Sequence, residues 1–490
     1  MRFQWKSRLS AKHLAAYIGG FFALRAASYV FTDALIFQAL IVIGLCMGLA
    51  SLYYKDRDTA IFLLIAELLL GGNGQYLELF GLSLRSALLI TFILVWMLHL
   101  ISSAGHRKEV YIPHRLFYIF LPAAVFILIG AVRGTLLGNG LVAVLQDTLP
   151  YLYFLLIPPL FHMIKRKRFQ KELTALIVAF VFGTVLWELM LFILFTTGIS
   201  IIHDPFYSWL RDAGAQKITD MHNGFFRIVA PVHLLIPLFL TVVYSLKLHS
   251  KKYQLWYLII PMLLILVLDL SRAYALGAIV GYLLLFRKQY VADWIKVGLI
   301  SLLITAGMFL ALNLSASLGT STGIELLTNR IQSFSEPEIE YSTYTRMAVL
   351  PRVWDMIIER PILGHGLGAT ITFPHPLSGM SITTRHFDWG LLELWAELGI
   401  LGLASVLILI GSIIVALHSH ILHAHHSRSV DRGVIAALMT LCFLGIFGPG
   451  LFHIYGILFI TLSISMTLPE APHRHDMLEW IHHKLHILPE

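Results

Sequence analysis

The sequence predicts an all-α polytopic membrane protein, with about 12–14 transmembrane helices and one long hydrophilic loop that contains amphipathic helices. Hydrophobic residues make up 58% of the 490 residues and charged residues only 13%, and the mean hydropathy is +0.78. Apolar runs long enough to cross a bilayer recur with short charged breaks between them. This much apolar sequence exceeds what a water-soluble core can hide, so lipid is the expected solvent for most of the chain.

The apolar runs define the expected spans and the division of the chain. Spans are expected near 13–31, 34–53, 59–72, 84–103, 116–133, 142–163, 173–198, 228–247, 254–270, 273–286, 297–315, 388–417, 433–449 and 451–468. The span at 388–417 is long enough to include a tilted or partly lipid-exposed extension. The expected domains are a membrane array of about 11 spans at 1–315, a long loop at 316–387, C-terminal membrane helices at 388–468 and a tail at 469–490.

The basic residues orient this array. Alternating loops place 24 of the 36 Lys and Arg residues on one side and 11 on the other. Because cytoplasmic loops hold the excess of positive charge, both termini and the tail are expected in the cytoplasm. The basic residues are not clustered on one soluble face, which argues against a nucleic-acid partner. Ten of the 11 outer residues are arginines, whose planar fork suits phosphate or carboxylate: Arg85, Arg133, Arg211, Arg227, Arg272, Arg330, Arg346, Arg352, Arg360 and Arg385. Either an anionic substrate or ion pairs with acidic residues of the outer loop explain this bias.

The long outer loop contains two recognisable patterns. Between Tyr344 and Ile358, apolar residues recur every three or four positions, which predicts an amphipathic helix that lies along the membrane surface; they are Met347, Leu350, Trp354 and Ile357. After this helix and Pro361, Gly364, Gly366 and Gly368 alternate. Glycines in this arrangement permit a tight turn or a close approach of the backbone to a ligand. A dinucleotide site is not indicated, because the flanking strand and helix are missing.

From residue 227 to residue 402 these motifs resemble the O-antigen ligase and polymerase superfamily of bacterial envelope glycosyltransferases. The resemblance rests on Pro361, the glycines of the turn, and His386 opening a segment that ends in Glu397-Leu398-Gly399. It also rests on the arginine-containing helix before the turn, on Ser271-Arg272 at the outer end of a span, and on Arg227 before the preceding span. The chain departs from the family where Phe387 follows His386 and where Val232 and His233 follow Pro231, which puts the acceptor in doubt more than the reaction class.

The resemblance implies a C-type-glycosyltransferase-like enzyme of the bacterial inner membrane with its active site facing the periplasm. Its donor is a glycan linked to undecaprenyl pyrophosphate, and no cofactor or metal is implied. The expected acceptor is lipid A core or another glycan, and membrane lipids surround the protein. The implied product is O-antigen ligated to lipid A core.

The resemblance supplies candidates for each catalytic task. Arg227 and Arg272 are expected to bind the pyrophosphate and stabilise the charge that develops on it. His386, with an ordinary pKa of about 6.5, is expected to be the general base in an inverting displacement. Arg346, Arg385, Gly366 and Gly368 are the expected substrate-binding residues. Without the motifs, span-end arginines more often reach lipid headgroups.

Several polar residues receive structural expectations instead. His203, His222, His233, His365 and His375 are expected to be structural hydrogen-bonding residues. Glu393 and Glu397 share one helix face, where they orient an arginine, close the site or make helix-end pairs. Glu188 lies in an apolar run and needs a partner. The histidines at 418–426 and 473–486 are expected to be mild basic anchors on the cytoplasmic side and not a metal site.

Other functions compete with ligation. A polymerase that joins repeat units and a protein O-oligosaccharyltransferase use the same donor chemistry. A polysaccharide transporter or flippase is a different class, which predicts internal repeats or charge at the bilayer midplane. The sequence has no clear repeat, and its outer arginines lie at the rim of the spans.

Overall fold

The computed structural model describes residues 11–72, 75–102, 114–164, 166–198, 200–250, 252–332, 336, 341–374, 380–422 and 429–467. Within these residues, nine helices are long and apolar enough to cross a membrane, and three shorter apolar helices accompany them. The chain is therefore an all-α polytopic membrane protein, and its few strands form three two-stranded antiparallel sheets.

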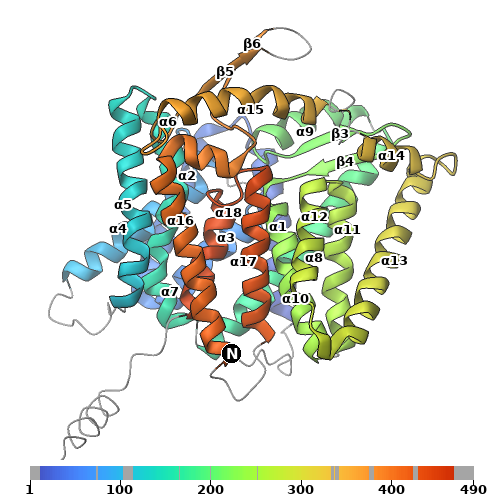
Figure 1. Cartoon of the computed structure of the whole chain (residues 1–490), viewed down its shortest axis with the longest axis horizontal. Helices are drawn as coiled ribbons and strands as arrows, with labels where there is room; N and C mark the ends of the chain where they lie inside the picture. The colour runs from blue at the N-terminus through green and yellow to red at the C-terminus, as the bar shows by residue number, and fades with distance from the viewer. Residues whose placement is uncertain are drawn as a thin grey trace, which may run out of the picture.

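The helices pack side by side into one bundle (Figure 1). In its N-terminal part the bundle contains α1 (Ala11–Val30), α2 (Leu35–Lys55), α3 (Arg57–Leu70), α4 (Leu84–Ser102), α5 (His114–Leu136), α6 (Leu141–Thr148), η2 (Leu149–Leu156), α7 (Ile157–Met163) and α8 (Lys167–Thr196). It continues with η3 (Pro231–Leu234), α10 (Leu235–Ser250), η4 (Tyr253–Leu255), α11 (Trp256–Asp269), α12 (Arg272–Leu284), η5 (Lys288–Tyr290), α13 (Val291–Ala316), α16 (Gly390–Leu422), α17 (Ser429–Phe447) and α18 (Ile454–Thr467).

The remaining elements gather at one end of the bundle, which we call the loop face. Figure 1 shows α15 lying across this end, with β5 and β6 projecting beyond it. The elements of the loop face are α9 (Ser200–Asp212), α14 (Ile324–Gln332), α15 (Tyr341–Glu359), β1 (Glu78–Leu79), β2 (Leu82–Ser83), β3 (Lys217–Asp220), β4 (Phe226–Val229), β5 (Ile371–Pro374) and β6 (Ser381–Thr384). The other end of the bundle is called the opposite face.

Each of the fourteen expected spans coincides with a helix or with consecutive helices. Twelve of them are among the nine long and three shorter apolar helices, which agrees with the expected 12–14. The two others, α1 and α3, form helices but are not among these twelve. α3 is not counted as an apolar helix because its 14 residues include three charged ones, Arg57, Asp58 and Glu67.

The long helix α16 is broken near its start. At Gly399 the backbone leaves the helical region with φ 73° and ψ 176°, so the nine residues before it form a separate short helix. Ile400 N–H, just after the break, donates to the Pro361 carbonyl at 2.8 Å. The extra length of this predicted span is therefore a short helix that carries Glu393 and Glu397, set off by the break.

The predicted amphipathic helix is confirmed as α15, and it has two apolar sides. Val349, Val353 and Ile357 are buried in a small separate core with Phe373 and Phe387. Two residues of the expected apolar face, Met347 and Trp354, are each 47% exposed. α15 thus packs on the β5–β6 hairpin and the segment before α16. Its second apolar side is about half exposed, and Trp354 on that side also packs edge-on against Trp395 of α16.

Candidate active site

A cavity of about 370 Å³ opens on the loop face and contains two of the predicted site residues, Arg385 and His386. We call it the His386 cavity. Its walls come from the β1–β2 region, α4, the α6–η2 segment, the start of α16 and the α17–α18 turn. Its ionisable lining residues are Glu78, Arg85, Asp147, Tyr151, Tyr153, Arg385, His386, Glu393, Glu397 and His453. The expected base therefore lies among side chains from widely separated parts of the chain.

His386 is paired with Glu393 across the start of α16. The distance from His386 Nδ1 to Glu393 Oε1 is 3.9 Å, and Glu393 Oε2 accepts a hydrogen bond from the Phe387 N–H at 3.0 Å. The nearby Glu393 carboxylate raises the pKa of His386 above its ordinary value, although burial opposes it. The Glu393 side chain is 3% exposed and the His386 side chain 69%, so water screens this pair only from the imidazole side. The Glu393 carboxylate thus lies beside one ring nitrogen of His386, an arrangement similar to that of a general base and its orienting group.

Two further carboxylates approach the same segment. Arg385 Nη1 lies 3.8 Å from Asp147 Oδ1 and donates to the Ala143 carbonyl at 3.5 Å, which ties the segment to α6. Glu397 is 3% exposed, and its carboxyl faces the N–H groups of Gly368 and Ala369. These contacts fix both acids in the cavity wall.

Carboxylates outnumber guanidinium groups in the His386 cavity. Among the described residues, four acids line it, with two arginines, Arg85 and Arg385. Arg85 is already paired, because its Nε lies 3.3 Å from Glu67 Oε2 and its Nη2 donates to the Gly72 carbonyl. Such a lining suits hydroxyl groups, which donate to carboxylates, better than it suits a diphosphate.

The predicted glycine turn packs against the bundle. Gly366 and Gly368 have φ of 80° and 79°, and a Cβ on either would meet backbone atoms, of α5 at Gly366 and of α6 at Gly368. Leu367 N–H donates to the Gly130 carbonyl at 2.9 Å, and Asn139 Nδ2 donates to the carbonyls of His365 and Leu367, each at 3.0 Å. Glycine therefore permits close approach to the protein's own backbone here, and substrate contact by Gly366 or Gly368 stays a prediction.

The other three predicted arginines lie outside the His386 cavity. Arg227 on β4 donates through Nε to the Asp269 carbonyl at 2.6 Å. Arg272 at the start of α12 donates to the Arg330 carbonyl at 3.3 Å and to Thr343 Oγ1 at 2.6 Å. The charges of Arg227 and Arg346 both act on the Tyr274 hydroxyl. These three residues, which we call the arginine cluster, therefore surround the α11–α12 turn.

One contact connects the arginine cluster to the segment that carries His386. Trp389 Nε1 donates to the Arg346 carbonyl at 3.0 Å, so α15 lies directly beside the residues that follow His386. The structure thus brings Arg385 and His386 together in one cavity. It places Arg227, Arg272 and Arg346 across the Phe387–Trp389 segment from that cavity.

A buried charge network contacts Arg227 through Asp269. His233 Nδ1 lies 2.5 Å from Asp269 Oδ2, and its Nε2 contacts Glu188 Oε1. Arg227 Nη2 is 3.9 Å from Asp269 Oδ1. His233, Glu188 and Asp269 are all about 1% exposed or less. This supplies the partner that Glu188 requires, and it confirms His233 as a structural hydrogen-bonding residue.

A family model described as O-antigen ligase matches residues 257–407. This match supports the resemblance to the O-antigen ligase superfamily for these residues, which we call the O-antigen ligase region. The O-antigen ligase region includes Arg272, Arg346, the glycine turn, Arg385 and His386, together with Glu393 and Glu397, whereas Arg227 precedes it. Comparison with curated proteins and with solved structures finds no match.

Sequence reasoning missed the residues that approach the O-antigen ligase region from elsewhere. Asp147 was not singled out, although an acid inside an apolar run is a signal of the kind that marked Glu188. The sequence also gives no local sign of His453, which only the fold brings to the His386 cavity, or of Glu67, which pairs with the cavity residue Arg85. Among the predicted structural histidines, His365 Nε2 faces the Met356 carbonyl at 3.0 Å.

In the part of the chain that the structure describes, no three His, Cys, Asp or Glu side chains group as a metal site requires. The predicted histidine cluster falls largely outside that part, at residues 423–426 and 473–486. The His375 residue and the His203 side chain also lie outside it.

Proposed function

We propose that this protein is an inverting glycosyltransferase that moves a glycan from undecaprenyl pyrophosphate to an acceptor hydroxyl on the periplasmic side of the inner membrane. The observation that carries the proposal is the His386–Glu393 pair, which belongs to the O-antigen ligase region and lines an open cavity. A glycosyl pyrophosphate is already activated, so the protein has two tasks: to remove the acceptor proton and to stabilise the leaving diphosphate.

His386 performs the first task in this proposal. Its neutral imidazole takes the proton from the acceptor hydroxyl, and the oxygen attacks the anomeric carbon as the bond to the diphosphate oxygen breaks. The Glu393 carboxylate stabilises the imidazolium that forms. Neither step requires a metal ion or a cofactor.

The two substrates occupy different parts of the loop face in this proposal. The acid-lined His386 cavity binds the hydroxyl-rich acceptor, because Asp147, Glu393 and Glu397 are hydrogen-bond acceptors. The arginine cluster binds the diphosphate, because guanidinium groups form bidentate bonds with phosphate oxygens. Arg385, at the mouth of the cavity, is assigned to substrate binding between the two parts.

Ligation to lipid A core is the reaction that we favour, on the motif context of the glycine turn and His386. The polymerase and the protein O-oligosaccharyltransferase use the same donor and base. A polysaccharide flippase would need neither a base nor its orienting carboxylate.

The deciding experiment uses purified protein with an undecaprenyl-pyrophosphate glycan and truncated lipopolysaccharide, comparing wild type with His386→Ala and Arg272→Ala. Transfer to lipopolysaccharide that disappears in both variants supports the ligase. Lengthened glycan on undecaprenyl pyrophosphate identifies a polymerase. If neither product forms, a transporter becomes the favoured function.

A kinetic comparison tests the division of substrates. Glu397→Gln is expected to raise KM for the acceptor, and Arg272→Gln to raise KM for the donor, each with a smaller effect on the other substrate. Equal effects on both constants in both variants would contradict the division.

A further inference from the structure

A second cavity of about 140 Å³ lies on the opposite face, between α10, α12, α16 and α17. We call it the basic cleft. Arg287, Arg432, His249 and His418 line its polar side, and no carboxylate is among its described lining residues. The cleft is therefore one-sided in charge.

Arg432 is held in place without a counter-charge from the described residues of the cleft. Its Nη1 lies 2.6 Å from His249 Nε2, while His249 Nδ1 faces the Ser245 carbonyl at 2.7 Å. These contacts assign the proton to Nδ1, so that Nε2 accepts from Arg432. The positive charge of Arg287 acts on both Arg432 and His249. Arg432 Nε is buried and has no hydrogen-bond partner among the described residues.

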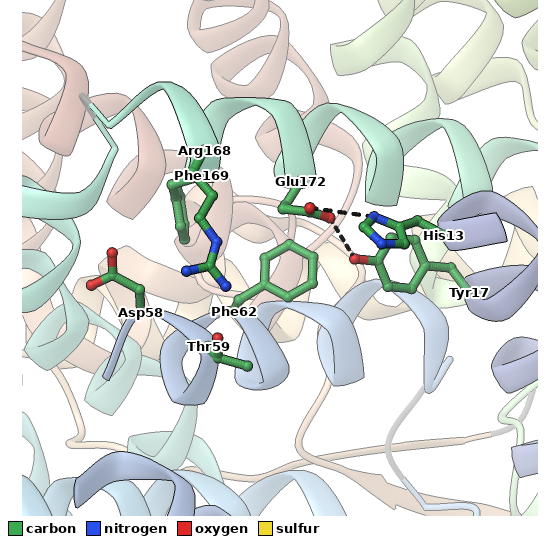
Figure 2. A pocket seen from close by; sticks show the side chains of 8 residues that line it. All are labelled: His13, Tyr17, Asp58, Thr59, Phe62, Arg168, Phe169 and Glu172. Atoms are coloured by element: carbon green, nitrogen blue, oxygen red, sulfur yellow. Dashed lines mark hydrogen bonds and ion pairs between the residues drawn. The ribbon is translucent and has the colours of Figure 1, made fainter. Parts of the chain in front are cut away.

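The cavity in Figure 2, also on the opposite face, provides the comparison. It lies between α1, α3 and α8 and contains Arg168, but Asp58 and Glu172 line it as well. Arg168 lies 3.5 Å from Asp56, and Glu172 accepts a hydrogen bond from Tyr17 at 2.8 Å. Here the protein supplies its own carboxylates, so no external anion is needed. A partly buried cation normally has a partner, and the basic cleft lacks one of this kind.

The other side of the basic cleft is apolar and faces outward from the bundle. Leu284 on α12 is 40% exposed and Met439 on α17 is 42% exposed, and both line the cleft. The walls are closely packed, because Gly433 lies against Val242 and Ser245 of α10. The cleft thus combines a preformed cationic end with an apolar surface in a membrane-spanning region.

We propose that the basic cleft binds the phosphate of an anionic membrane phospholipid. The guanidinium groups of Arg287 and Arg432 hold the phosphate oxygens, and an acyl chain lies along Leu284 and Met439. Basic pockets between membrane helices commonly bind anionic headgroups in this way. This site is separate from the His386 cavity and does not depend on the proposed reaction.

The test measures lipid binding to the full-length protein in a non-ionic detergent, by native mass spectrometry with phosphatidylglycerol, phosphatidylethanolamine or inorganic phosphate as probe. Wild type is expected to retain phosphatidylglycerol selectively. The double variant Arg287→Gln/Arg432→Gln is expected to bind it about tenfold or more weakly, since each lost charged hydrogen bond contributes strongly. The control Arg168→Gln, a paired arginine on the same face, is expected to bind it like wild type.

Three outcomes overturn the proposal. Equal phosphatidylglycerol binding by wild type and the double variant would show that the basic cleft is not the binding site. An equal loss in Arg168→Gln means general attraction of headgroups to the basic face, and full competition by inorganic phosphate means a site for the free ion. If the double variant does not fold, Arg287→Gln decides alone, because the Arg287 side chain is exposed and its replacement should disturb the packing little.

Discussion

The His386 imidazole is exposed whereas its partner Glu393 is buried, so replacing His386 should affect catalysis more than folding. Glu393 is fixed in a dry position, while the imidazole faces the cavity. Loss of the base in His386→Ala is expected to lower kcat by about 100-fold to 10,000-fold, measured as glycan transfer by purified protein. The control is His222→Asn, an exposed histidine with φ 72°, a conformation that asparagine tolerates. Full activity of His386→Ala would remove His386 as the base.

The pair also predicts a pH effect with a definite sign. Glu393 raises the pKa of His386, so the neutral base is lost as the pH falls through a value above the ordinary one. In Glu393→Gln, the pKa of His386 falls and the acid limb of the kcat/KM profile should move to lower pH, while kcat decreases. Glu359→Gln, an exposed acid with 62% of its side chain accessible, should leave the profile in place. An unchanged acid limb in Glu393→Gln would show that Glu393 does not act on the base.

Single residues mark how far the sequence predicts the site. His386 and Arg385 were identified from a local motif, and both line the cavity. Asp147 could not be placed beside Arg385 in advance, because 238 positions of sequence separate them and only the packing of α6 against the turn brings them together. The roles of Arg227 and Arg272 stay predictions, and their observed partners are groups of the protein.

At the scale of the element, α16 offers a matched pair of glycines. At Gly399, φ is 73° and a Cβ would meet the Ile362 carbonyl, whereas at Gly411 no atom lies within 4 Å. Gly399→Ala should therefore lower the free energy of unfolding by about 2 kcal/mol or more. Gly411→Ala should leave it unchanged or raise it by up to about 1 kcal/mol. Thermal melting in one detergent compares the two, and equal melting temperatures would contradict the role of the break.

The helices themselves were predictable because their signal is local. An apolar run of sufficient length specifies a span whatever surrounds it, and each expected span forms helix. The break in α16 was not predicted, since it depends on the Pro361 carbonyl and the glycine turn, which the long loop brings from outside the helix. The packed side of α15, with Val349 and Val353, was missed for the same reason, because its partners are the β5–β6 hairpin and Phe387.

Across the whole molecule, the network of Glu188, His233, Asp269 and Arg227 joins α8, η3, α11 and β4 through buried charges. His233→Leu leaves two buried carboxylates without their shared partner, and it should lower the free energy of unfolding by about 3–5 kcal/mol. Arg168→Gln breaks an ion pair with side chains 73% and 36% exposed, and it should cost about 1 kcal/mol or less. The two melting temperatures check this difference, and equal losses would show that the network adds nothing beyond a surface pair.

The exposed His386 ring has a consequence for the order of events in the proposed reaction. With 69% of the side chain accessible, solvent reaches the imidazole whenever the acceptor is absent. A base that activates a sugar hydroxyl also activates water, and water attacking the donor would release free polysaccharide. Productive turnover then requires the acceptor to arrive first and to cover the imidazole, so a shortage of acceptor would appear as glycan released by hydrolysis.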